Sequence, residues 1–217
     1  MSQANDSVTV TPGAGATIAT HLAGGKEHQV VMVADSSGHI EGSAETWLLW
    51  IPTSATAASK RWFDLFNATG SGKIIDVRGI WAVPLGAVVT GTYFIPCDFF
   101  RVSTVGTGGT AATSSSIVGT TPGFAPMDTS NTALPAGITA RAIPTGGSTV
   151  TNHLWRGYVP TEETNAATYM SAVMNLIPAG EFRQPLTLRE SQGLLVQEDA
   201  TATPVGSMGW LVQFTVE

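Results

Sequence analysis

Charged side chains are scarce in this sequence. Asp, Glu, Lys and Arg make up 12% of its 217 residues, which is about half the share found in an ordinary soluble domain. The sequence contains three lysines, none of them after Lys73, and its net charge is −6. Because binding to a phosphate backbone requires clustered Lys and Arg side chains, the sequence predicts no nucleic-acid partner.

Reactive and metal-binding patterns are also missing. The single cysteine, Cys97, cannot form an internal disulfide, and the four histidines match no zinc-ligand spacing. The run 70–73 resembles a phosphate-binding loop only in part, because Asn67 stands where that motif requires Gly and Ile74 where it requires Ser or Thr. We therefore predict no catalytic residue, no bound metal and no cofactor.

Long hydrophobic runs are absent as well. No apolar stretch reaches the roughly 20 residues that a membrane-spanning helix needs. The first residues carry neither the basic region nor the apolar region of a secretory signal. The sequence therefore predicts no membrane partner and no export by a signal of its own.

Apolar residues nevertheless make up 43% of the chain, and they are arranged in short segments with strand periodicity. Apolar clusters flank the turn-forming run 67–72, which predicts two strands around a tight turn, and residues 210–216 alternate in the same way. Further strands are expected at 28–33, 46–51, 88–95, 99–103, 116–118, 138–142, 184–189 and 194–197. Many short strands between Gly and Pro turns favour a mainly β fold, an antiparallel β-sandwich or jelly roll. Helical spacing allows one short helix, over 161–177.

Composition divides the chain into two parts. Residues 1–26 lack large apolar side chains, which predicts an extended N-terminal arm, and residues 27–217 are expected to form the sandwich domain. A Gly-, Thr- and Ser-rich excursion occupies about 103–150, and Asp128 is the only charged residue from 102 to 140. A surface with so little charge is poorly suited to exposure, so we expect an interface there. Its expected anchors are the larger apolar residues Ile117, Val118, Phe124, Met127 and Leu134.

All six tryptophans lie in or beside expected strands. We interpret them as core or interface anchors, and a carbohydrate-binding face is the alternative. The residues concerned are Trp47, Trp50, Trp62, Trp81, Trp155 and Trp210.

Several blocks of sequence resemble segments of tailed-phage virion proteins. They are LFNATGSGKIIDVRGIW at 65–81, LPAGITAR at 134–141, QPLTLRESQGL at 184–194 and QFTVE at 213–217. The resemblance covers residues 27–217 in scattered blocks and is one to phage structural proteins as a class.

The resemblance implies a non-enzymatic virion protein, most like a capsid decoration, or cement, protein that stabilises the shell by bridging major capsid subunits. Its implied partners are the major capsid protein and copies of itself in a symmetric homo-oligomer. Its implied location is the capsid surface of the virion, assembled in the host cytoplasm. One alternative is a tail or fibre component that binds host surface glycan. Another is an enzyme such as a depolymerase.

Overall fold

The structure is a computed structural model, and it describes residues 16–23, 26–33, 44–85, 93–114, 119–131, 133–161, 175–177, 185–202 and 206–217. The chain divides into two compact units, Met1–Ser43 and Ala44–Glu217. Every regular element in the described part of the chain is a β-strand. The mainly β fold predicted from the sequence is therefore confirmed.

The N-terminal unit contains one hairpin. Strand β1 (Ala16–Ala23) pairs antiparallel with β2 (Lys26–Val33), and Ala23 lies opposite Lys26 across the turn. Strand β2 matches the strand expected at 28–33. Strand β1 lies inside the range interpreted as an extended arm, and the two compact units divide at 43/44, whereas the sequence placed the boundary at 26/27.

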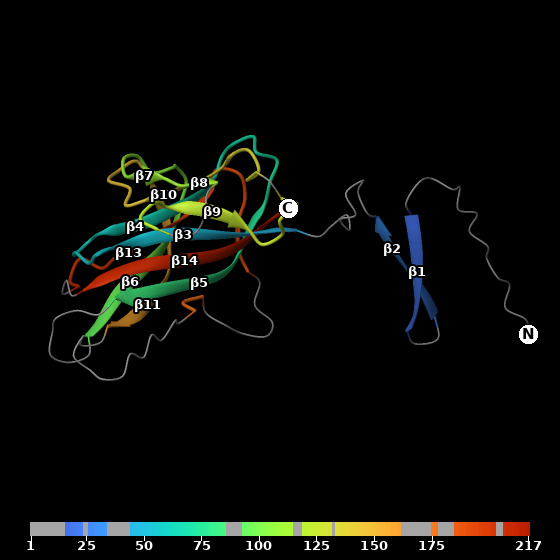
Figure 1. The fold of residues 1–217 in the computed structure, drawn as a ribbon, viewed down its shortest axis with the longest axis horizontal. Helices are drawn as coiled ribbons and strands as arrows, with labels where there is room; N and C mark the ends of the chain where they lie inside the picture. Colours follow the sequence, from blue (N-terminus) through green and yellow to red (C-terminus); the bar gives the residue numbers. More distant parts are fainter. Residues whose placement is uncertain are drawn as a thin grey trace, which may run out of the picture. The chain divides into compact units, whose positions relative to one another are not determined.

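The larger unit holds twelve of the described strands in two six-stranded sheets (Figure 1). They are β3 (Glu45–Ala55), β4 (Arg61–Asn67), β5 (Ile75–Leu85), β6 (Tyr93–Val102), β7 (Thr110–Ala111), β8 (Thr113–Ser114), β9 (Gly123–Pro126), β10 (Ile138–Ala142), β11 (Val150–Thr161), β12 (Leu186–Leu188), β13 (Gln192–Glu198) and β14 (Ser207–Val216). One sheet has the order β11-β6-β13-β4-β10-β7 and the other β12-β5-β14-β3-β9-β8. All pairs are antiparallel except β8 with β9.

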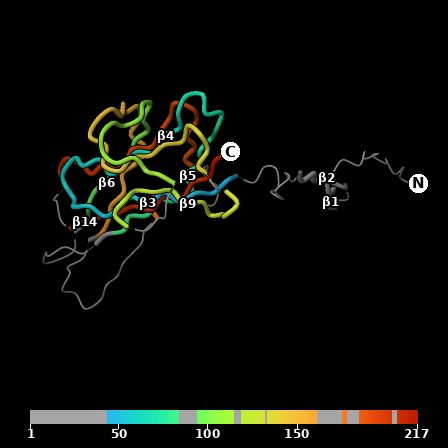
Figure 2. Tube along the Cα trace, turned by 45° about the horizontal axis from the view of Figure 1, so that its top comes forward, coloured from blue at the N-terminus to red at the C-terminus, as the bar shows by residue number. Residues whose placement is uncertain are grey.

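Eight of these strands follow the connectivity of a jelly roll. Strands β3, β5, β12 and β14 belong to one sheet, and β4, β6, β11 and β13 to the other. The chain therefore crosses between the sheets at nearly every connection outside the excursion, as the tube in Figure 2 traces. The segment between β6 and β11 adds β10 beside β4 and β9 beside β3, so it widens both sheets on the same side of the sandwich.

The core lies between the inner faces of the two sheets. Trp210 of β14 is fully buried, and its ring lies 6.2 Å from that of Trp62, 5.9 Å from that of Phe63 and 6.3 Å from that of Phe99. These three partners come from β4 and β6 in the opposite sheet. Trp47 is also fully buried, so three of the six tryptophans are core residues, as the sequence predicted.

The strands on either side of run 67–74 do not form a hairpin. Strand β4 and strand β5 belong to different sheets, so the tight turn predicted there is a crossover loop. The Asn67 side chain holds its start, since its Nδ2 donates to the carbonyls of Lys73 (2.8 Å) and Leu188 (3.1 Å). Gly70 and Gly72 adopt φ angles of 77° and 65°, which glycine accepts without strain.

Two prolines that directly follow the expected strands 46–51 and 88–95 lie inside the observed strands. Pro52 lies in β3, where the pairing with β14 is irregular between Met208 and Trp210, and such irregularities accommodate a residue that lacks an N–H group. Pro96 lies in β6 opposite Tyr158. Of the helix expected over 161–177, residues 162–174 lie outside the described residues, while Thr161 ends β11 and Asn175 bridges to Trp81.

Replacing Trp210 with alanine tests this core. We expect a loss of about 3–5 kcal/mol in the free energy of unfolding, because the ring fills the space between both sheets. Phe94→Ala is the control, since Phe94 is 64% exposed and its loss should change stability by no more than about 0.5 kcal/mol. Urea denaturation measures both, and equal effects would contradict the assigned core.

Candidate interaction surface

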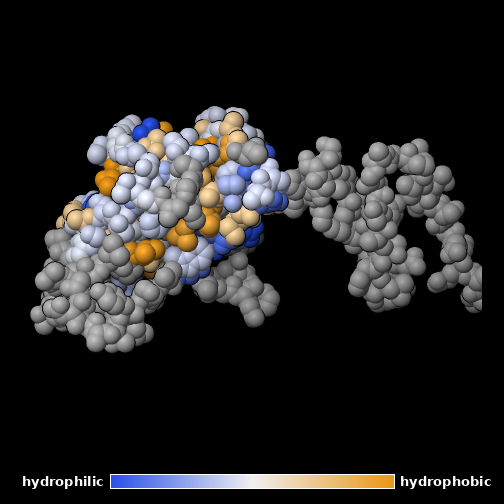
Figure 3. Space-filling view, viewed as in Figure 1, coloured by the Kyte–Doolittle hydropathy of each residue, from blue (hydrophilic) through white to orange (hydrophobic). Residues whose placement is uncertain are grey.

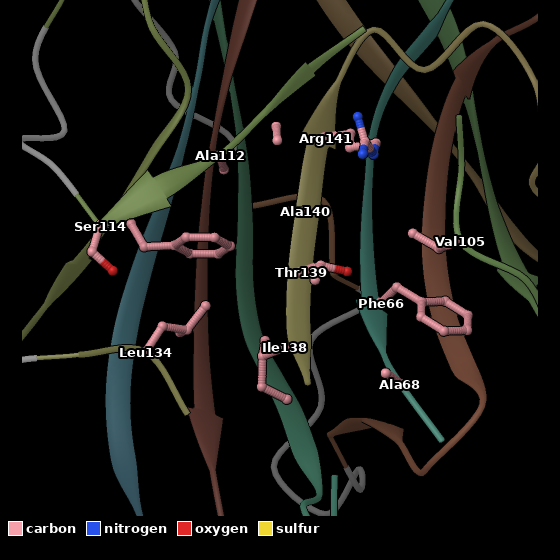
Figure 4. A pocket seen from close by; sticks show the side chains of 12 residues that line it. Phe66, Ala68, Val105, Ala112, Ser114, Leu134, Ile138, Thr139, Ala140 and Arg141 are labelled. Carbon is pink, nitrogen blue, oxygen red and sulfur yellow. The ribbon is translucent and has the colours of Figure 1, made fainter. Parts of the chain in front are cut away.

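The excursion forms a shallow hollow of about 340 Å³ at the edge where β10 lies beside β4. Both faces of β10 contribute to it. Figure 4 shows Phe66 and Val105 on one side of this strand and Leu134 and Ala112 on the other. The lining is mainly apolar, and Arg141 is its only charged residue. Such a hollow suits apolar side chains of a protein partner.

Two of the five predicted interface residues line this hollow, in different ways. Phe124 of β9 is 2% exposed and packs edge-to-face on Phe214, 6.1 Å between ring centroids. It is thus a core residue that forms the floor, and its burial makes it unsuited to be a free anchor. Leu134 is half-buried and packs against the same core.

The other three predicted residues lie elsewhere. Met127 is 56% exposed, directly after β9, and does not line the hollow. Ile117 and Val118 lie outside the described residues. Val105, which is not among the five predicted residues, is 38% exposed and does line the hollow. Its neighbours Thr104 and Gly106 give no strand pattern that could have identified it.

A buried carboxylate fixes the excursion to the sheet. Asp64 of β4 is fully buried; its Oδ2 accepts a hydrogen bond from the Gly106 N–H (2.5 Å) and its Oδ1 one from the Arg141 N–H (3.1 Å). Burial raises the pKa of Asp64, although the two N–H donors oppose that shift. The carboxylate thus serves as a backbone acceptor for two segments of the excursion.

Other ionisable groups that are at least partly buried also make structural contacts. Glu198 accepts a hydrogen bond from the Ala57 N–H (3.1 Å), and burial raises the pKa of its carboxyl. The Lys60 ammonium donates to Ser54 Oγ (2.7 Å), and burial lowers its pKa. Cys97 is fully buried and burial raises the pKa of its thiol, so this cysteine is an inert core residue.

The face drawn in Figure 3 carries mostly weakly polar residues. On the face drawn in Figure 3, orange apolar residues lie among weakly polar ones, with strongly hydrophilic residues in scattered spots. Among the described residues, no three His, Cys, Asp or Glu side chains come together as metal ligands, and no helix could span a membrane.

Comparison with known proteins gives no further assignment. No family model, no curated protein and no solved structure matches this chain.

Gly106 allows the excursion to approach Asp64, and its replacement tests that contact. A Cβ atom at this position would overlap Asp64 Oδ2 and lie 2.8 Å from Pro144 Cβ. We expect Gly106→Ala to cost about 1–3 kcal/mol of stability. Gly146→Ala is the matched control, because its Cβ would meet nothing closer than 3.5 Å. Thermal unfolding compares them, and a neutral Gly106→Ala would disprove the close approach.

The raised pKa of Asp64 predicts a pH dependence. Folding raises this pKa above its ordinary 3.8. The protonated carboxyl therefore stabilises the folded state below that pH, and this stabilisation is lost as the pH rises through the folded-state pKa. Asp64→Asn cannot titrate. The free energy of unfolding of this variant should therefore lie furthest below that of the wild type in acid, and the difference should shrink as the pH rises. Urea unfolding from roughly pH 3 to pH 7 measures this difference, and a deficit that grows with pH would mean that folding lowers the pKa.

Proposed function

We propose that this chain is a non-enzymatic phage virion protein that decorates the capsid and stabilises the shell by bridging major capsid subunits. The observation that carries the proposal is the apolar hollow, built from an excursion that contains a single charged residue between 102 and 140. A partner that covers this surface would remove apolar area from water and would desolvate only one charged side chain of the lining, that of Arg141.

The fold is compatible with this role. Jelly rolls occur in viral capsid proteins and also in lectins, so the fold alone does not choose between them. The resemblance of several sequence blocks to phage virion proteins favours the first. A decoration protein also needs no reactive group, since many copies acting together stabilise a shell through modest contacts.

The copy number per virion tests the role directly. Quantitative mass spectrometry of purified particles should find this chain at an abundance comparable with that of the major capsid protein. An abundance far below that level would favour the alternative, a tail or fibre component that binds host glycan. Particles that lack the chain should also break open at a lower temperature than complete ones.

A pair of valine variants tests the hollow as the contact surface. Val105→Asp places a carboxylate on its lining, while Val150→Asp makes the same change at a valine that is 45% exposed and lies outside it. We expect the first to weaken binding to chain-free particles by at least about tenfold, and the second to bind normally. Binding should change little with salt, because few ion pairs are available to screen.

Equal binding by the two variants would show that the hollow is not the contact. Circular dichroism of both variants is the control for folding, since a change at position 105 lies next to Gly106 and its bond to Asp64.

A further inference from the structure

The second surface of interest is the opposite end of the sheet that carries the hollow. Strand β11 ends the order β11-β6-β13-β4-β10-β7, and among the described strands only β6 pairs with it. An unpaired strand edge can recruit another strand through its free N–H and C=O groups. The backbone groups of β11 that face this edge follow from its pairing with β6.

Tyr158 lies opposite Pro96, which has no N–H group, and the Pro96 carbonyl accepts from the Asp199 N–H (2.9 Å) on the far side of β6. Tyr158 and Pro96 therefore form a non-hydrogen-bonded pair, and the N–H and C=O groups of Tyr158 point to the free edge. By the alternation of an antiparallel strand, those of Arg156 do the same.

Most of β11 carries features that discourage pairing. Register shifts interrupt it between Val150 and Asn152 and between His153 and Trp155, and Pro160 follows near its end. Bulges and prolines are the usual means of blocking an edge. The stretch 156–159 between them is regular, so it is the window through which another strand could add.

Large exposed side chains accompany this window. Tyr158 is 54% exposed and Phe94, near it on β6, is 64% exposed. Both lie on the face of the sheet that also carries Arg156, because residues two apart on a strand share a face. Exposed Tyr, Phe and Arg side chains in one place are typical of protein interfaces.

Arg156 is held in a fixed position on this face. Its Nε and Nη2 atoms donate to Asp98 Oδ1 (2.7 Å) and Oδ2 (2.9 Å), and Nη2 also donates to Asp199. The His153 ring lies 2.9 Å from Asp98 Oδ1. A guanidinium that is already ordered loses little side-chain entropy when a partner covers it.

We propose that β11 pairs antiparallel with β11 of a second copy of this chain, about a two-fold axis at Gly157. This register sets Arg156 opposite Tyr158 of the partner subunit, and the reverse. The outward groups of each such pair form two hydrogen bonds, giving four per dimer.

The sequence of the window is complementary to itself in this register. The Arg156 side chain of each copy lies opposite Tyr158 of the partner subunit, with its guanidinium held by Asp98 and Asp199, and no two like charges lie opposite each other. Gly157 places no side chain on the axis. The dimer joins the two sheets edge to edge and leaves the hollow, at the other end of each sheet, open to a different partner.

Tyr158→Pro tests this pairing in the full-length chain. Proline removes an N–H that bonds to nothing in β6, so the fold should persist, while the dimer loses two hydrogen bonds and its dissociation constant should rise at least about 30-fold. Tyr158→Phe keeps the N–H and should associate as the wild type does. Sedimentation equilibrium over a concentration series measures all three.

Val159→Pro verifies the edge assignment, because the Val159 N–H points to β6 and its loss should destabilise the fold. A wild-type chain that stays monomeric throughout the series would overturn the proposal, as would Tyr158→Pro associating normally. Amide exchange by NMR is a readout that needs no variant. The Arg156 and Tyr158 amides should be protected at high concentration and exchange faster on dilution, and concentration-independent exchange would also overturn it.

Discussion

The structure of the larger unit depends on the burial of two sheet faces against each other. The cluster of aromatic rings around Trp210 is built from both sheets, so neither sheet buries its inner face without the other. Trp210 belongs to one sheet, while Trp62, Phe63 and Phe99 belong to the other. Because strands consecutive in the chain mostly lie in opposite sheets, almost no local hairpin can form before both sheets assemble. This places most contacts far apart in sequence, which predicts slow folding and a cooperative core.

That constraint explains what the sequence could predict and what it could not. Strand periodicity identified β10 and β14 closely, because buried residues alternate with less buried ones along β10 and over 210–214 of β14. The same periodicity could not show that β4 and β5 separate into different sheets, since a crossover loop rich in Gly and Asn has the composition of a tight turn. Strand β11 was not predicted from the sequence, because two register shifts break the alternation of its residues.

The interface residues were harder to predict than the strands. Apolar residues in a charge-poor segment are candidates for either a core or a contact, and composition does not distinguish the two. Phe124 lies in the core because β9 joins the sheet beside β3. Val105 is 38% exposed, and the next residue, Gly106, donates its N–H to the buried Asp64 carboxylate. This carboxylate thus holds the backbone beside an exposed valine.

The two ends of this sheet also differ in the kind of contact they offer. At the β10 end the contacting groups are apolar side chains, which tolerate small changes in a partner's shape and give little directional preference. At the β11 end they are backbone hydrogen bonds and an ordered Arg156, which require one register. The proposed role, in which the chain binds a copy of itself in one geometry and a repeating surface at many equivalent positions, would use both kinds of contact. The jelly roll allows them on one sheet because an insertion between β6 and β11 can remodel one end of the sheet without altering the strand that ends the other.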